Sequence, residues 1–130
     1  MTAYPLTVAT LLVALFIYIW SIARVGGARG RHQVQAPAVT GHPEFERILR
    51  AQQNTVEQLV VFVPLLALAA AFWGDRWGAL YGVVWCIGRA LYIVTYAQDA
   101  QKRSTGFMIT ALSTLVVMLA LVVTLALRIV

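Results

Sequence analysis

Residues 44–57 read EFERILRAQQNTVE and lead, through Gln58, into the uncharged run LVVFVPLLALAAAFW at residues 59–73. The first stretch is the most polar helical stretch of a very apolar chain. Arg50, Asn54 and Glu57 are spaced i, i+4 and i+7, so they share one face of a helix. The whole segment predicts a membrane span whose polar start projects from the bilayer or lies among the headgroups. A carboxylate at that depth needs a partner, which makes Glu57 a functional candidate.

The composition of the chain is that of a membrane protein. The chain has 130 residues, of which 61% are hydrophobic and 12% charged, whereas soluble domains carry roughly 25% charge. Four long apolar stretches predict an all-α integral membrane protein, a four-transmembrane-helix antiparallel bundle. We expect a single domain over residues 1–130, with spans at 4–23, 44–73, 77–97 and 106–128. The first span lacks a charged leader region and a clear cleavage site, so we expect it to be retained.

The positive charges predict the orientation in the membrane. Arg76 and Arg128 lie on the side of the termini, and more cations lie on the side of the first and third loops: Arg24, Arg29, Arg31, Arg47, Arg50, Lys102 and Arg103. The positive-inside rule then places these two loops in the cytoplasm and both termini outside. The arginines do not form the basic run or the aromatic interleaving of a nucleic-acid surface, so we expect no nucleic-acid partner. The one cysteine, Cys86, excludes an internal disulfide and is more typical of a small core residue than of a nucleophile.

The first loop, residues 25–43, is rich in glycine, proline and arginine, which argues against a continuous helix. His32 and His42 lack a ligand constellation in the sequence, so we predict no metal site. The basic residues of this loop are suited either to lipid headgroups or to an anionic substrate, and the sequence leaves both open.

The third span carries a second polar set. Arg89, Tyr92 and Tyr96 are spaced i, i+3 and i+7 and share one helix face. An arginine within a span is not expected to face lipid. We expect Glu57 to be its partner, either as a salt bridge that fixes helix register or as part of a polar pocket. The fourth span is almost purely apolar and is interpreted as packing.

Several arginines, one carboxylate, one amide and two phenols at a membrane edge favour a small zwitterionic ligand with net negative charge. Arginine binds carboxylates in bidentate fashion, and a carboxylate binds an ammonium group. Arginine also lowers the pKa of a nearby thiol and so favours the nucleophilic thiolate. These residue types do not by themselves select such a ligand over a phosphate or an amino acid.

The runs EFERILRAQQNTVE (44–57) and GRALYIVTYAQDAQKRSTGF (88–107) resemble the MAPEG family, the membrane-associated proteins of eicosanoid and glutathione metabolism. The family pattern is roughly E-x-E-R-x-x-R-A-x-x-N-x-x-E, then G-R-x-x-Y-x-x-x-Y, then a basic pair before the fourth span. The motifs cover about residues 44–107, and the four-span layout covers the rest. Their joint spacing is specific, and either half alone is moderately so.

The resemblance implies a homotrimer in membrane lipid that binds glutathione between subunits near the cytoplasmic face. The residues that match glutathione-binding positions of the family are Arg50, Gln52, Asn54, Glu57, Tyr92, Tyr96 and Arg29. Gln52 matches a residue contributed across the interface, and Arg103 matches the arginine that activates the glutathione thiol in leukotriene-forming members. Arg89 and Arg31 are expected to support the site or the structure. Glutathione would be a co-substrate, with no metal.

The chain departs from the leukotriene-forming members at three positions: Gln58 replaces a tyrosine, Gly30 an arginine, and the proline after the motif is displaced to Pro64. These departures favour a general bacterial-type member in an inner membrane. We predict a glutathione transferase, with glutathione peroxidase activity also open, that acts on a lipophilic electrophile from the bilayer. The first alternative is a non-enzymatic lipid- or glutathione-binding regulatory member. A small multidrug exporter is the remote alternative, because it would need a carboxylate within the first span.

Overall fold

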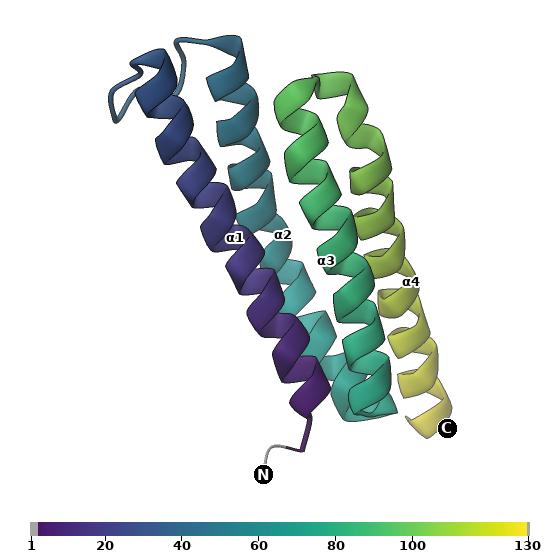
Figure 1. The fold of residues 1–130 in the computed structure, drawn as a ribbon. Helices are drawn as coiled ribbons and strands as arrows, with labels where there is room; N and C mark the ends of the chain where they lie inside the picture. Colours follow the sequence, from purple (N-terminus) through teal and green to yellow (C-terminus); the bar gives the residue numbers. More distant parts are fainter. Residues whose placement is uncertain (1–2, 130) are drawn as a thin grey trace.

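A computed structural model of the chain describes residues 3–129. Over these residues the chain forms the helices α1 (Pro5–His32), α2 (Pro43–Trp73), α3 (Asp75–Gln98) and α4 (Ser104–Ile129), with a short 3-10 turn η1 (Ala100–Arg103) before α4 (Figure 1). Each of the four is long and apolar enough to cross a membrane. The predicted all-α four-helix membrane bundle is therefore confirmed, and the chain is a multi-pass integral membrane protein.

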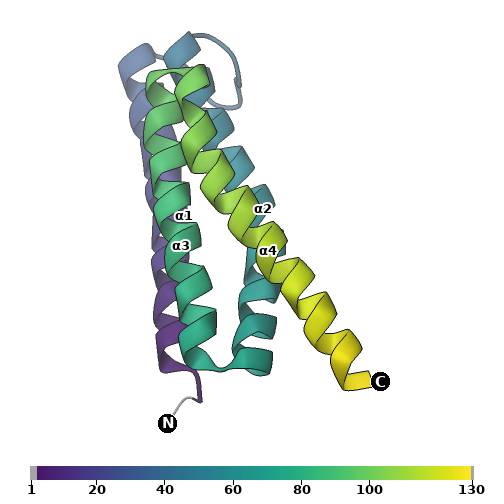
Figure 2. The ribbon, with the colours of Figure 1, turned by 90° about the vertical axis from the view of Figure 1, so that its right-hand side faces the viewer.

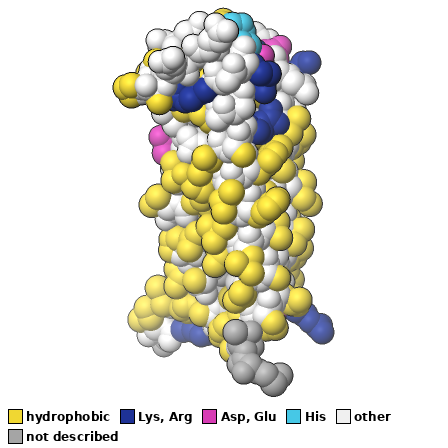
Figure 3. Space-filling view, turned by 60° about the vertical axis from the view of Figure 1, so that its left-hand side comes forward, with side chains coloured by type: hydrophobic (Ala, Val, Ile, Leu, Met, Phe, Trp, Pro, Cys, Tyr) yellow, Lys and Arg dark blue, Asp and Glu magenta, His cyan; other side chains and the backbone are white. Residues whose placement is uncertain are grey.

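The helices run alternately up and down, so the ends of the bundle differ. The α1–α2 loop and the α3–α4 connection lie at one end, and both termini lie at the other with the α2–α3 turn (Figure 1). On the face seen in Figure 3, hydrophobic side chains cover the middle, and charged side chains and histidine gather near the loop end, which we call the polar end. A second, smaller group of cations lies at the opposite end.

The core is built mainly from α1, α2 and α3. Phe62, Leu66 and Trp85 are almost fully buried, and the rings of Phe62 and Trp85 stack with centroids 4.1 Å apart. Helix α4 joins this core less closely, because it diverges from α3 towards its C-terminal end (Figure 2), where Thr124 accepts a hydrogen bond from Trp73 of α2. The polar end is therefore where α4 lies nearest to α3.

The expectation that residues 25–43 form no continuous helix is wrong for their first part, because α1 continues to His32. Each glycine costs a helix about 1 kcal/mol relative to alanine. Tertiary packing offsets this cost, since Val25 and Ala28 are buried in one cluster with Phe45 and Ala97. The helix then ends at His32, and the left-handed backbone of Gln33 (φ 53°) caps it.

Helices α3 and α4 approach each other backbone to backbone at the polar end. A Cβ atom added at Gly106 would lie 2.7 Å from Cα of Tyr92 and 2.8 Å from the carbonyl oxygen of Gly88. A Cβ atom added at Gly88 would lie 2.6 Å from a methyl group of Ile109. These distances are below any normal carbon contact, so the two glycines set how closely α4 packs on α3.

We predict that Gly106→Ala destabilises the bundle by about 1–3 kcal/mol, because the added methyl group meets backbone atoms that cannot move aside. The midpoint of thermal unfolding in detergent, followed by circular dichroism at helical wavelengths, should fall by several degrees. Gly26→Ala is the matched control, since a Cβ atom there meets nothing within 4 Å. Its midpoint should stay equal or rise, and equal midpoints for the two variants would contradict the proposed close packing.

Candidate functional site

The face of α2 that carries Arg50 and Asn54 turns towards α3. Ala51 and Thr55 on the same helix are buried and hold this face against the bundle. The side-chain amide of Asn54 donates a hydrogen bond of 2.6 Å to the hydroxyl oxygen of Tyr92 on α3. The predicted amide and phenol are thus in direct contact across two helices.

Arg103 reaches the same place from the connection between α3 and α4. Its guanidinium donates a hydrogen bond of 3.1 Å to the hydroxyl of Tyr96 and lies 5.0 Å from the centroid of that ring. The ring of Tyr96 in turn lies 5.4 Å from that of Tyr92. The turn η1 that positions Arg103 is capped by Asp99, whose carboxylate accepts a hydrogen bond from Gln101 N. The Arg103 side chain itself is exposed, so a ligand can approach it.

A pocket of about 580 Å³ opens beside these groups. This volume lies within the usual range for small-molecule sites, about 300–1,000 Å³. Arg50 and Tyr96 line it together with further residues: Val39, Thr40, Pro43, Glu46, Arg47, Leu49, Gln53 and Ala100. Two arginines, one carboxylate, an amide and a phenol in one pocket suit a small ligand that carries carboxylate and ammonium groups.

Glu46, Arg47 and Gln53 are pocket residues that the sequence analysis did not predict. Arg47 Nε donates a hydrogen bond of 3.2 Å to the carbonyl oxygen of Ala97, so Arg47 also ties α2 to the last turn of α3. A signal was present in the sequence, because Glu46, Arg50 and Gln53 are spaced i, i+4 and i+7 and share a helix face.

The predicted ion pair between Glu57 and Arg89 is wrong for the protomer. Arg89 is fully buried and donates a hydrogen bond of 3.4 Å to Thr110 on α4, and its guanidinium lies over the ring of Tyr92 at 4.5 Å. Glu57 instead lies exposed, at a separate pocket of about 220 Å³ that Ala111 of α4 also lines. The pair does not form because Arg89 lies on the face of α3 that packs against α4, whereas Glu57 is turned outwards from α2.

The remaining predicted residues lie elsewhere in the protomer. Gln52 donates a hydrogen bond of 3.2 Å to the hydroxyl of Tyr18 on α1. Arg29 of α1 donates a hydrogen bond of 2.8 Å to the carbonyl oxygen of Ala38, which lies in the α1–α2 loop. Arg31 pairs with a carboxylate oxygen of Glu44 at 3.0 Å. Gln52, Arg29 and Arg31 therefore lie apart from the pocket. The structure brings together five other predicted residues: Arg50, Asn54, Tyr92, Tyr96 and Arg103.

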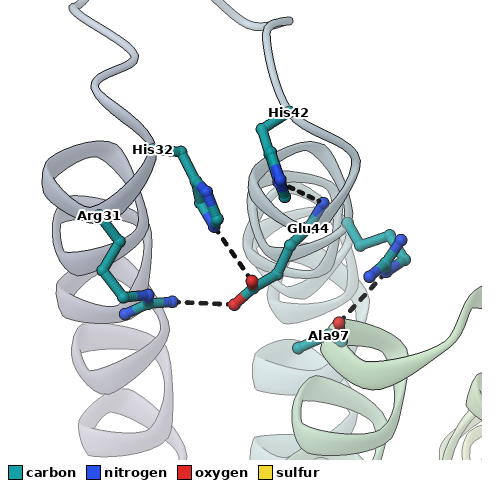
Figure 4. Close-up of polar contacts among 6 residues, drawn as sticks. Arg31, His32, His42, Glu44 and Ala97 are labelled. Atoms are coloured by element: carbon teal, nitrogen blue, oxygen red, sulfur yellow. Dashed lines mark hydrogen bonds and ion pairs between the residues drawn. The ribbon is translucent and has the colours of Figure 1, made fainter.

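The expectation that the two histidines lack a ligand constellation is also wrong. His32 ends α1 and His42 precedes α2, and the loop between them brings their rings into a stack with centroids 3.6 Å apart (Figure 4). His32 Nε2 lies 3.0 Å from Oε2 of Glu44, and the other oxygen of Glu44 bonds Arg31 (Figure 4). Sequence separation hid this cluster, because it depends on the path of the loop.

A basic and phenolic pocket thus lies at one end of four helices that are each apolar enough to cross a membrane. Residues 7–123 match the MAPEG family, and the chain belongs to that family.

Three relatives illustrate the similarity. An uncharacterized protein of Synechocystis sp. is 42% identical over 104 residues, which cover 80% of this chain and 76% of the relative. Human microsomal glutathione S-transferase 2 is 45% identical over 84 residues, 65% of this chain and 57% of the enzyme. Bovine leukotriene C4 synthase is 37% identical over 92 residues, 71% of this chain and 61% of the enzyme. The matched segments thus span less than two thirds of either enzyme.

We predict that Arg89→Met leaves the thermal stability of the protein in detergent unchanged or higher. Within residues 3–129, two guanidinium nitrogens of Arg89, Nε and Nη1, are buried without a hydrogen-bond partner. Methionine fills much of the same volume without that desolvation cost. Arg89→Ala is the companion variant and should lose about 2 kcal/mol or more, because it leaves a cavity. If Arg89→Met is as unstable as Arg89→Ala, the guanidinium has a stabilising partner that the protomer alone does not supply.

Proposed function

We propose that this protein is a membrane-bound glutathione transferase that joins the glutathione thiolate to lipophilic electrophiles. The contact between Arg103 and Tyr96 at the edge of the Arg50 pocket is the observation that carries this proposal. Relatives named as glutathione transferases support it. The same thiolate would also serve a glutathione-dependent peroxidase activity.

Glutathione offers two carboxylates, one ammonium group and one thiol. In the proposal Arg50 binds a carboxylate, and Asn54 and Tyr92 orient the peptide by hydrogen bonds. Glu57, about two turns further along α2 at its own pocket, binds the ammonium group. Arg50 and Glu57 are seven residues apart, about 10 Å along a helix axis. An extended tripeptide also spans about 10 Å, so a glutathione molecule lying along α2 can reach both groups.

Gln52 and Arg29 fit the proposal through a neighbouring subunit. In the protomer they bond Tyr18 and Ala38, away from Asn54 and Tyr92. We propose a homotrimer in which Gln52 and Arg29 of one protomer complete the site of the next, at the cytoplasmic side of a bacterial inner membrane. The bundle face beside α4 would then face lipid, from which an apolar electrophile can enter.

The proposed mechanism has two steps. The Arg103 guanidinium lies beside the glutathione sulfur and favours the thiolate over the thiol, so the thiol proton passes to solvent. The thiolate then attacks the electrophilic carbon, the carbon–sulfur bond forms, and the leaving group departs with the electron pair of its bond. Tyr96 positions Arg103 for the first step through the hydrogen bond between the two side chains.

We predict that Arg103→Ala lowers the rate of glutathione conjugation to a chlorodinitrobenzene electrophile by about ten- to a thousandfold at pH 7, the effect of losing one nearby cation on the thiolate fraction. The dissociation constant of glutathione, measured by calorimetry, should change much less. Lys102→Ala is the matched control, because it removes the adjacent exposed cation.

Equal rates for Arg103→Ala and the unmodified chain would remove Arg103 from the proposed role. If the unmodified chain binds glutathione but conjugates none of a panel of electrophiles, the protein is a binding member of the family and the transferase proposal fails.

A further inference from the structure

The cluster of His32, His42 and Glu44 joins the end of α1 to the start of α2. One nitrogen of each histidine and one oxygen of Glu44 all lie within 4.8 Å of one another. His32 and Glu44 are half-buried and His42 is exposed, so the cluster is shielded on one side and open to solvent on the other. None of the three residues lines the Arg50 pocket.

The chemistry of this ligand set is that of a transition-metal site. Two imidazoles and one carboxylate are a common protein contribution to a Zn²⁺ ion that keeps one position open. Two ligand atoms on one tetrahedral Zn²⁺ lie about 3.3 Å apart when each bond is about 2.0 Å. His32 Nε2 and Glu44 Oε2 lie 3.0 Å apart, so these two already have the spacing of ligands on one ion.

The second histidine presents one ring nitrogen as an acceptor. His42 Nδ1 accepts a hydrogen bond of 3.2 Å from the backbone N–H of Glu44, so the lone pair of this nitrogen points towards the start of α2. The two rings are stacked with an interplanar angle of 11°, and a tilt of the exposed His42 ring would bring both lone pairs onto one ion. A metal bond would then replace this single hydrogen bond.

Arg31 provides the support that a carboxylate ligand needs. It bonds Oε1 of Glu44 at 3.0 Å and leaves Oε2 turned towards His32. Groups that hold a ligand in this way orient it for the metal. Arg31 also balances the charge of Glu44 when the site contains no cation.

We propose that His32, His42 and Glu44 bind one divalent transition-metal ion of the Zn²⁺ class, with solvent as a further ligand. The ion ties α1 to α2 across the loop of residues 33–42. Val39, Thr40 and Pro43 belong to or adjoin this loop and line the pocket with Arg50. Metal binding therefore stiffens one wall of that pocket, whichever ligand the pocket takes.

The test is a Co²⁺ titration of the full chain, purified in detergent with an affinity tag free of histidine. Visible absorption reports coordination, and calorimetry gives affinity and stoichiometry. We expect one Co²⁺ per chain, displaced by Zn²⁺. His32→Ala, His42→Ala and Glu44→Gln should each weaken binding by about tenfold or more. Glu46→Gln is the matched control, because Glu46 is an exposed carboxylate in the same first turn of α2 and lies outside the cluster.

A second measurement needs no variant. The chain contains two histidines, His32 and His42. Modification of histidine by diethylpyrocarbonate therefore reports on this cluster alone. Zn²⁺ should protect both rings from modification. The proposal is overturned if Co²⁺ shows no saturable binding, if binding survives in the double variant His32→Ala/His42→Ala, or if Zn²⁺ leaves the modification rate unchanged.

Discussion

The close contact between the backbones of α3 and α4 is the constraint on which the polar end of this protein depends. Gly106 lies against the backbone of Tyr92 and Gly88, and no side chain larger than hydrogen fits there without a shift. Arg103 lies three residues before Gly106, so fixing the start of α4 on α3 also fixes Arg103 near Tyr96. Beyond this contact α4 diverges from α3 (Figure 2), so the alignment of these two helices is determined at the polar end.

The bilayer explains how the remaining polar groups are arranged. Because hydrocarbon offers no hydrogen bonds, polar side chains inside the spans need partners within the protein. The threonines of α4 provide them: Thr110 bonds Arg89, Thr114 bonds the hydroxyl of Tyr81, and Thr124 accepts from the indole of Trp73. The helix that the sequence analysis interpreted as packing thus also satisfies polar groups of α2 and α3.

Periodicity and hydropathy correctly predicted the features that depend on one helix alone. The four apolar helices follow from the lengths of the uncharged runs, and the shared faces of Arg50 with Asn54 and of Tyr92 with Tyr96 follow from helical spacing. The contacts between those faces could not be predicted, since helical spacing fixes which residues share a face but not the neighbour that the face meets. Arg89 illustrates this limit, because it bonds Thr110 of α4 and not the expected Glu57.

The loop between α1 and α2 shows the same limit at the level of the backbone. Gly26, Gly27 and Gly30 indicated a broken helix, but burial of Val25 and Ala28 against α2 and α3 outweighed their low propensity. The histidine cluster forms only because α1 continues to His32 and the loop then returns to His42. Both features depend on tertiary packing, which local composition does not encode.

In the proposed function, the polar end of the bundle binds glutathione and ionises its thiol. The most direct measurement is an ultraviolet difference spectrum of the unmodified protein in detergent, titrated with glutathione near neutral pH, because a thiolate absorbs where a thiol does not. If the polar end ionises the thiol, a thiolate band should appear that saturates with glutathione concentration and is absent with S-methylglutathione. Saturable binding of glutathione by calorimetry without such a band, or no binding at all, would contradict the proposed function.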